Sequence, residues 1–224
     1  MCGRFTLFST YETLIKRFGI EAAIAEEDYE VSYNIAPSQQ VLAVINDGSK
    51  NRLGYLRWGF IPSWAKDESI GYKMINARAE SLSEKRSFKN AYQKHRCLIV
   101  ANAFYEWRKA GEEKRPFCIK LKSDEPFGFA GLWESWRSQE GKLIHSCTII
   151  TTKANEAVSS VHERMPVILK QEDEKLWLDP GLHDTNLLDK LLTPCQSGMM
   201  DIFEVSKEVN SPKNNSANLI ERIG

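Results

Sequence analysis

The chain has 224 residues, of which 42% are hydrophobic and 27% are charged, a composition typical of a soluble globular protein with a substantial core. Its 30 Lys and Arg residues are balanced by 30 Asp and Glu residues, which excludes a uniformly basic surface and requires any polyanion site to be a local patch. No apolar run reaches the roughly 18–20 residues of a membrane span and no signal peptide opens the chain, so we expect a cytoplasmic protein with no membrane partner.

The N-terminal Met1-Cys2 pair is the first stretch with chemistry of its own. Once the initiator methionine is removed, Cys2 carries both a free α-amine and a thiol. The amine, with a reference pKa of about 7.7–8.0, can attack an aldehyde to form a Schiff base, and the thiol can close a five-membered ring onto the same carbon. Two alternatives are a thiolate that acts alone as a peptidase nucleophile, and a cysteine that is incidental to its place beside the start codon.

The first predicted helix covers residues 10–18. Ser9 to Glu12 forms an S-x-x-E capping box, apolar residues follow at helical spacing, and Gly19 supplies the stop. By the same rules, strands are predicted over residues 41–45, 52–58, 97–101, 116–121, 127–134, 143–152, 167–169 and 201–205, and further helices over residues 83–94, 155–160, 172–178 and 186–192.

These elements predict the fold class. Many short strands joined by hairpin-length turns, with few helices between them, indicate an α+β fold around a mostly antiparallel, curved sheet with a barrel-like core and flanking helices. No linker divides the chain, so we expect a single domain over residues 1–224, with a core at 1–210 and a polar C-terminal tail at 211–224. Since no heptads or extended apolar helix face indicate a partner subunit, we expect a monomer.

Residues 57–66 are rich in aromatic side chains but are interrupted by Gly59 and Pro62, so part of this segment is expected to be a loop that carries exposed rings. Trp64, with basic residues on both sides, suits the stacking of unpaired bases together with phosphate attraction. The alternative is that the tryptophans of this segment fill gaps in the core.

Two ionisable residues are notable further along the chain. Glu106 lies between large aromatic residues where the strand 97–101 and its continuation are predicted to end; it is either exposed by alternation or partly buried with a raised pKa, as a general acid requires. His162-Glu163 lacks the second histidine of an H-E-x-x-H zinc motif, because position 166 is proline. The five cysteines include no C-x-x-C pair, so we expect no disulfide framework, no metal and no cofactor, and buried core thiols at Cys97, Cys118 and Cys147.

Six separated motifs together resemble one family, the SOS-response-associated peptidase (SRAP) domain. They occur in the family's order over nearly the whole chain: Met1-Cys2-Gly3-Arg4-Phe5, Tyr33-Asn34-Ile35-Ala36-Pro37, Trp58-Gly59-Phe60-Ile61-Pro62-Ser63-Trp64, Asn76-Ala77-Arg78-Ala79-Glu80, Phe104-Tyr105-Glu106-Trp107 and His162-Glu163-Arg164-Met165-Pro166. The segment from Val205 to Asn214 resembles the family's closing motif more loosely.

The resemblance implies a sensor of abasic sites in single-stranded DNA that crosslinks itself to the lesion through a thiazolidine ring. It implies catalytic roles for Cys2, Asn76, Glu106 and His162, with Asn76 orienting the sugar and the two ionisable residues moving protons. It also implies a weak lyase activity, reversal of the crosslink, and a link to the SOS response to DNA damage. The residues expected to contact DNA are Arg4, Asn34, Pro37, Trp64 and Arg78.

Three alternatives stay open. The first is a cysteine peptidase limited to removing its own N-terminal residues, with Cys2, His162 and Glu106 as nucleophile, base and orienting acid. The second is a non-covalent binder of single-stranded DNA, whose complexes salt would reverse. The third concerns one residue: Arg78 could form a salt bridge to Glu80 or Glu106 instead of binding a phosphate.

Overall fold

The structure, a computed structural model, describes residues 2–223. Most of its long strands form at the predicted runs of β-branched and aromatic residues, but the predicted strand over residues 167–169 is wrong, because only an isolated bridge at Ile168 occurs there. The strands are β1 (Phe5–Leu7), β2 (Ala22–Ala23), β3 (Ser32–Ile35), β4 (Gln40–Asn46), β5 (Asn51–Trp58), β6 (Asn76–Arg78), β7 (Arg96–Ala101), β8 (Ala103–Ala110), β9 (Glu113–Leu121), β10 (Phe127–Arg137), β11 (Leu143–Lys153), β12 (Arg164–Pro166) and β13 (Met200–Glu204). The α-helices are α1 (Tyr11–Arg17), α2 (Arg86–Lys94), α3 (Glu156–Ser159), α4 (Gln171–Leu178) and α5 (Thr185–Leu191).

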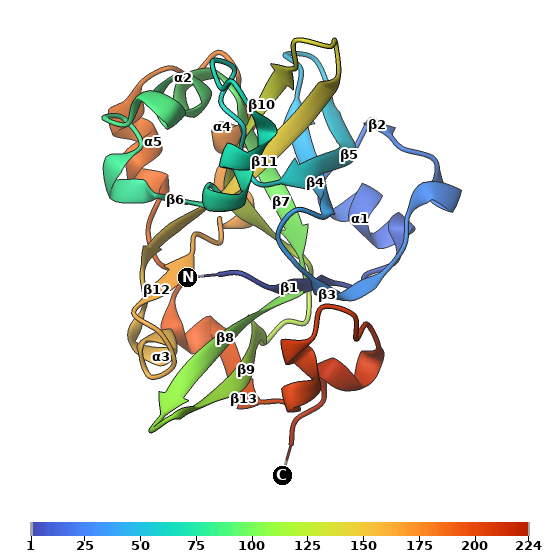
Figure 1. Ribbon diagram of the computed structural model, residues 1–224, viewed down its shortest axis with the longest axis vertical. Coiled ribbons are helices and arrows are strands. Elements are labelled where there is room, and N and C mark those ends of the chain that lie inside the picture. Colours follow the sequence, from blue (N-terminus) through green and yellow to red (C-terminus); the bar gives the residue numbers. More distant parts are fainter. Residues whose placement is uncertain (1, 224) are drawn as a thin grey trace.

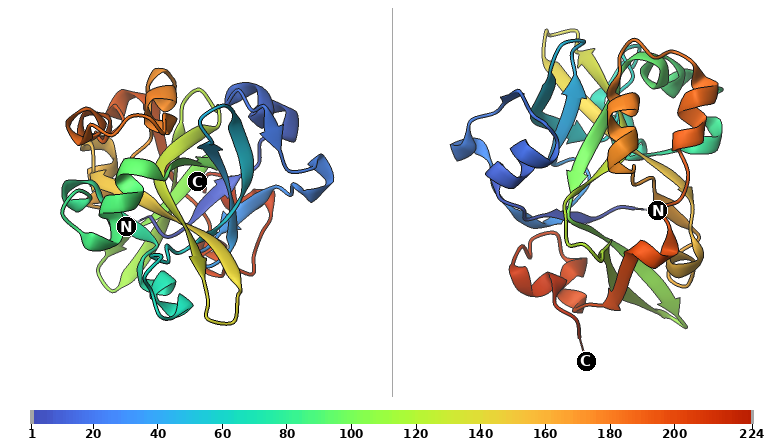
Figure 2. Two further views of the ribbon diagram at one scale, coloured as in Figure 1. Left: turned by 90° about the horizontal axis from the view of Figure 1, so that it is seen from above. Right: turned by 180° about the vertical axis from the view of Figure 1, so that it is seen from behind.

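The larger sheet closes on itself. Its strand order is β12-β11-β10-β7-β4-β5-β2, and β5 also pairs with β11. This last pairing is parallel and joins Arg57 to Ser146 and Trp58 to Cys147. Strands β11, β10, β7, β4 and β5 therefore form a barrel-like ring (Figures 1 and 2). The predicted α+β class with a barrel-like core is confirmed.

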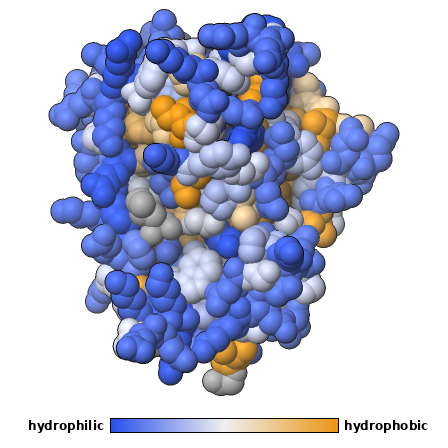
Figure 3. Space-filling view, viewed as in Figure 1, coloured by the Kyte–Doolittle hydropathy of each residue, from blue (hydrophilic) through white to orange (hydrophobic). Residues whose placement is uncertain are grey.

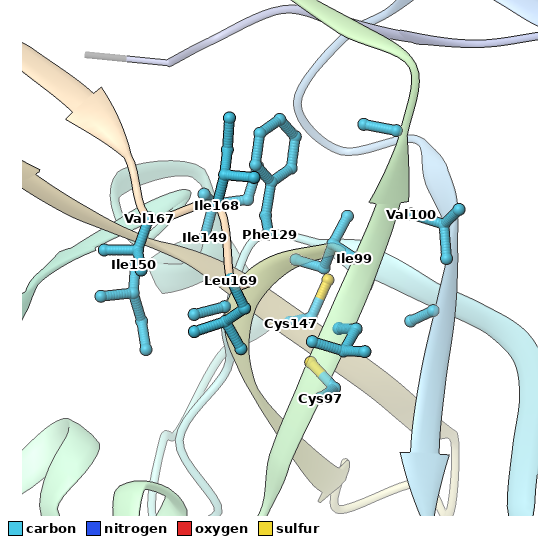
Figure 4. Close-up of a cluster of buried hydrophobic side chains, with 14 of the residues drawn as sticks. Cys97, Ile99, Val100, Phe129, Cys147, Ile149, Ile150, Val167, Ile168 and Leu169 are labelled. Atoms are coloured by element: carbon cyan, nitrogen blue, oxygen red, sulfur yellow. The ribbon is translucent and has the colours of Figure 1, made fainter. Parts of the chain in front are cut away.

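Apolar side chains fill the interior of this ring, and Figure 4 shows part of that cluster. Cys97, Cys118 and Cys147 are all buried, as predicted. Gly131 of β10 lies directly beside Cys97 of β7 in the sheet register. A Cβ atom at position 131 would come within 2.9 Å of the Cys97 Sγ atom, so the close approach of these strands requires glycine.

The second sheet has the strand order β13-β9-β8-β1-β3 and is antiparallel throughout. Strand β1 is an inner strand, in which Phe5 is paired with Phe104 of β8 and with Ile35 of β3. The start of the chain therefore runs between the barrel and the second sheet, as Figure 1 shows. This position brings Cys2 into the middle of the molecule.

Asn102 marks the point where the chain leaves the barrel for the second sheet. Its side-chain oxygen accepts hydrogen bonds from the backbone N–H groups of Phe8 (2.8 Å) and Ser9 (3.0 Å). The prediction that Glu106 lies at a strand end is wrong, because β7 stops before Asn102 and Glu106 lies inside the separate strand β8. At the end of β7, the side chain of Asn102 binds backbone groups of another segment. From the sequence alone, such a residue is difficult to distinguish from one that faces solvent.

Helix α1 occupies the predicted segment, but its cap differs from the prediction. The N-cap is Thr10, whose hydroxyl accepts from the backbone N–H of Thr13 at 3.3 Å. The Ser9 hydroxyl instead accepts a hydrogen bond from the Asn102 side chain at 2.8 Å, so it is not available to cap the helix. Gly19 has a φ of +55°, which fits its predicted role as the residue that ends the helix.

Helices α2, α4 and α5 lie together on one side of the barrel, with α1 on the opposite side (Figures 1 and 2). The chain continues to pack beyond residue 210: Leu219 is fully buried and belongs to the same apolar cluster as Tyr105 of β8. Within residues 2–223 there is no helix whose length and apolar character would let it span a bilayer.

Candidate functional site at the N-terminal cysteine

Cys2 lies just before β1 and its side chain is fully buried. The thiol is 3.9 Å from the backbone oxygen of Arg4. Burial raises the pKa of the Cys2 thiol well above its usual value, and the nearby Glu106 carboxylate raises this pKa further. The thiol is therefore protonated in the resting protein at neutral pH.

Asn76 holds the backbone of Cys2. It begins β6, which pairs in parallel with β11 and places Asn76 beside Ile149. The Asn76 side-chain N–H donates to the carbonyl oxygen of Cys2 at 2.8 Å. The Oδ1 atom of Asn76 is buried and has no hydrogen-bond partner among residues 2–223, so it can accept a hydrogen bond from a bound molecule.

Glu106 projects from β8 and is only 3% exposed. Burial raises the pKa of its carboxyl group above the ordinary value, and the His162 imidazole partly opposes this shift. Of the two sequence-based alternatives for Glu106, the structure has the buried one with a raised pKa. A carboxyl group with a raised pKa holds its proton more tightly than an exposed one and is suited to deliver it to a bound substrate.

His162 lies in the loop between α3 and β12. Its Nδ1 atom lies 3.0 Å from the backbone nitrogen and 3.2 Å from the backbone oxygen of Arg164, so the Arg164 backbone holds this side of the ring in either tautomer. The Arg164 guanidinium donates two hydrogen bonds to the Glu80 carboxylate, at 2.6 and 3.0 Å, and one to the Thr151 carbonyl at 2.7 Å. These contacts fix the loop and hence the orientation of the imidazole.

The four predicted catalytic residues thus come together from four separate parts of the chain. Asn76 contacts Cys2 directly. The charge of Glu106 acts on the thiol of Cys2, and the charge of His162 acts on the carboxyl group of Glu106. A cleft of about 410 Å³ opens beside them and is lined by Glu106, Trp107, Lys109, Lys114, His162 and Asn210. Glu106 and His162 line this cleft, while Cys2 and Asn76 lie outside its lining and Cys2 is fully buried.

Arg4 and Asn34, two of the predicted DNA contacts, contact each other. The Arg4 guanidinium donates to the Asn34 side-chain oxygen at 2.8 Å and to the Val209 carbonyl at 2.7 Å, and it lies 5.9 Å from the Trp107 ring centre. Burial lowers the pKa of Arg4 from its usual value. Asn34 is itself buried and its amide donates to the carbonyl oxygens of Val209, Ser211 and Asn214.

Arg78, Trp64 and Pro37 lie outside the lining of that cleft. Arg78 is exposed and forms no salt bridge within residues 2–223, although its charge acts on the Glu80 carboxylate, which Arg164 binds. The Trp64 ring is 49% exposed, which excludes a core-filling role, and the guanidinium of Arg86 lies 5.5 Å from its centre. Pro37 is partly buried in the turn between β3 and β4.

Sequence reasoning assigned no role to Trp107, Asn210, Lys109 or Lys114, although all four line the cleft. The Trp107 indole N–H donates to the Asn210 side-chain oxygen at 2.7 Å, which links β8 to the C-terminal segment. Side chains alternate along a β-strand, so Trp107 and Lys109 share one face of β8, and this pattern could have indicated that both line the cleft. The residues next to Asn210 do not indicate that Asn210 lines it. Within the described chain, no cluster of three His, Cys, Asp or Glu residues could hold a metal ion.

Comparisons with known proteins give consistent matches. A family model described as SOS response associated peptidase (SRAP) matches residues 1–212. Abasic site processing protein YoqW of Bacillus subtilis (strain 168) is 56% identical over 222 residues, which cover 99% of this chain and 99% of that protein. Abasic site processing protein HMCES of Xenopus tropicalis is 28% identical, over 88% of this chain and 68% of that protein. The crystal structure of a Bacteroides thetaiotaomicron protein aligns with a TM-score of 0.90 at 26% identity and covers 99% of this chain and 100% of that chain.

Proposed function

The chain belongs to the SOS response associated peptidase (SRAP) family, and from that membership and the geometry of the cleft we propose that it processes abasic sites in single-stranded DNA by bonding covalently to them through Cys2. The observation that carries this proposal is the position of Cys2, held by Asn76 beside a buried carboxyl group and a histidine. An abasic deoxyribose opens to an aldehyde, which is the electrophile that a free N-terminal cysteine captures.

The proposed reaction begins after removal of Met1, which lies outside the described residues. The Cys2 α-amine attacks the aldehyde carbon, and Glu106, a carboxyl group whose pKa burial raises, donates a proton to the departing oxygen. A C–N bond forms and water leaves, which gives a Schiff base. The thiol then adds across the C=N bond: sulfur bonds to carbon, the thiol proton passes to nitrogen, and a thiazolidine ring results.

The protonated state of the thiol favours this order of steps. Because burial raises the pKa of Cys2, the thiolate is scarce before the substrate arrives, and the amine is the better first nucleophile. His162, whose Nδ1 side the Arg164 backbone holds, would assist the opening of the sugar ring and the return of protons when the crosslink reverses. β-Elimination from the Schiff base would give a weak lyase activity in competition with ring closure.

The proposal includes the predicted DNA contacts. Arg4 and Arg78 would bind phosphates near the lesion, Trp64 would stack on an unpaired base, and Pro37 would shape the channel. Asn34 would act indirectly, since its amide is engaged with Arg4 and the C-terminal segment.

A denaturing gel tests the proposal. The purified protein, with loss of Met1 verified by mass spectrometry, is mixed with single-stranded DNA that carries one abasic site. We expect a shifted band that Cys2→Ala abolishes and that borohydride reduction of the abasic sugar prevents. Cys2→Ser keeps the amine and should give only a Schiff base that borohydride can trap. A Cys2→Ala protein that still forms the denaturant-resistant complex would overturn the proposal.

The second candidate function is a peptidase limited to the protein's own N-terminus. It rests on the same grouping of Cys2, Glu106 and His162, which could serve as nucleophile, orienting acid and base. Expression in cells that lack methionine aminopeptidase distinguishes it: autoprocessing predicts that Met1 is still lost from the wild type and is retained only in Cys2→Ala.

A further inference from the structure

The β8–β9 hairpin carries two lysines that oppose each other at the opening of the cleft. Lys109 of β8 is the direct cross-strand partner of Lys114 of β9, and both are exposed. Both also line the cleft that contains Glu106 and His162. Directly opposed like charges destabilise an antiparallel pair of strands, so this arrangement has a cost that the fold alone does not explain.

The other basic residues around this hairpin are partnered. Arg108 lies 4.5 Å from the centre of the Phe117 ring, Arg115 pairs with Glu204 at 3.7 Å, and Lys207 pairs with Glu113 at 3.2 Å. Lys109 and Lys114 form no ion pair with any residue between 2 and 223. Arg108, which faces Arg115 across the strands, has no ion pair within residues 2–223 either, but of these three residues only Lys109 and Lys114 line the cleft.

The spacing of these lysines from Glu106 indicates what they bind. A strand rises by about 3.3 Å per residue, so the backbone of Lys109 lies about 10 Å along β8 from the backbone of Glu106. That separation is too long for contact with the reacting sugar and suits the phosphodiester group of a flanking nucleotide. Hydrophilic residues cover the lower left of the face in Figure 3, where Figure 1 places the hairpin tip.

We propose that Lys109 and Lys114 form a phosphate-binding site that holds the DNA backbone one step beyond the abasic sugar. This inference rests on the proposed function. It adds the side of the cleft along which the DNA strand continues from the abasic sugar. The site takes phosphodiester groups without regard to base, because the ammonium groups act as point charges. Glu112, at the tip of the hairpin, limits the basic surface at that end.

The test compares the double variant Lys109→Ala/Lys114→Ala with Lys50→Ala/Lys122→Ala, which removes the same charge from exposed positions away from the cleft. Binding to single-stranded DNA with a tetrahydrofuran analogue of the abasic site, which cannot react, is measured over a range of salt concentrations. We expect the hairpin variant to bind about tenfold more weakly than the wild type, with a salt slope smaller by about 1.4, from about 0.7 for each lost phosphate contact. The control should match the wild type.

The rate of crosslinking at saturating DNA separates this inference from the proposed function. We expect the hairpin variant to reach the wild-type rate once its weaker binding is overcome. A hairpin variant with the affinity and salt slope of the control would overturn the phosphate site even if crosslinking is normal. A wild-type protein that neither binds the analogue nor crosslinks would overturn the proposed function instead.

Discussion

The side-chain amide of Asn76 donates a hydrogen bond to the carbonyl oxygen of Cys2 at 2.8 Å, and this contact fixes the one residue on which the proposed chemistry depends. It joins β6, which the barrel strand β11 holds by parallel pairing, to a chain end that would otherwise be tethered only through β1. The cysteine is thus positioned by the barrel as well as by its own strand.

Replacing Asn76 by Ala should slow crosslinking by about a hundredfold, because a shift of about 1 Å in a reacting group has an effect of this size. The measurement is the single-turnover rate at saturating abasic DNA. Asn46→Ala, which removes an amide hydrogen-bonded only at the β4–β5 turn, is the matched control. An unchanged rate in Asn76→Ala would show that the amide does not orient Cys2 for reaction.

Glu80 should influence the reaction through His162 without touching the substrate. Its carboxylate holds Arg164, whose backbone N–H fixes the Nδ1 side of the imidazole. Glu80→Gln weakens this ion pair, so we expect a rate about tenfold lower at neutral pH, an altered pH profile and an unchanged affinity for DNA. Glu84→Gln, an exposed position nearby, serves as the control. A uniform loss of activity at every pH would point to a general structural effect.

Glu106 should make the folded protein less stable as the pH rises. Because burial raises the pKa of this carboxyl group, the folded state holds its proton more tightly than the unfolded state. The resulting stabilisation is complete below the ordinary carboxyl pKa and is lost as the pH rises through the raised pKa. Glu106→Gln stays neutral, so its melting temperature should exceed that of the wild type at pH 8, and the difference should shrink at pH 4.

The same variant should crosslink about 10²–10⁴ times more slowly, because the glutamine amide cannot transfer a proton. Glu112→Gln, at the exposed hairpin tip, should change neither property. Equal pH dependence of melting in Glu106→Gln and the wild type would contradict the shifted pKa. The melting temperatures report the loss of stability caused by burying the Glu106 carboxyl group, and the crosslinking rate reports the part of this group in the reaction.

The sequence allowed prediction of the features that depend on local chemistry. The S-x-x-E pattern located helix α1, and aromatic and β-branched runs located the barrel strands. Motifs that resemble a family also indicated Asn76, Glu106 and His162, the three residues that the fold places near Cys2. The helix and the barrel strands could be located because the period of apolar residues can be read without knowing the distant contacts.

The features that escaped prediction depend on long-range contacts. Asn102 ends β7 by accepting hydrogen bonds from Phe8 and Ser9, which are more than ninety residues away in sequence. The same contact engages Ser9 and moves the helix cap to Thr10. Asn210 reaches the cleft only because the Trp107 indole binds it. No local pattern encodes such pairs, since a polar residue in a loop is also consistent with simple exposure to solvent.

Asn34 should prove to be a stabilising residue whose loss weakens DNA binding through Arg4. Its amide donates to three carbonyl oxygens of the C-terminal segment, and its oxygen accepts from the Arg4 guanidinium. Asn34→Leu leaves these buried groups without partners, so we expect a loss of about 2–4 kcal/mol in unfolding free energy, measured by urea denaturation. Amide hydrogen exchange should speed up in residues 209–215, where the carbonyl groups lose their donor. If exchange stays slow there while DNA affinity falls, Asn34 contacts the DNA directly and the indirect role is wrong.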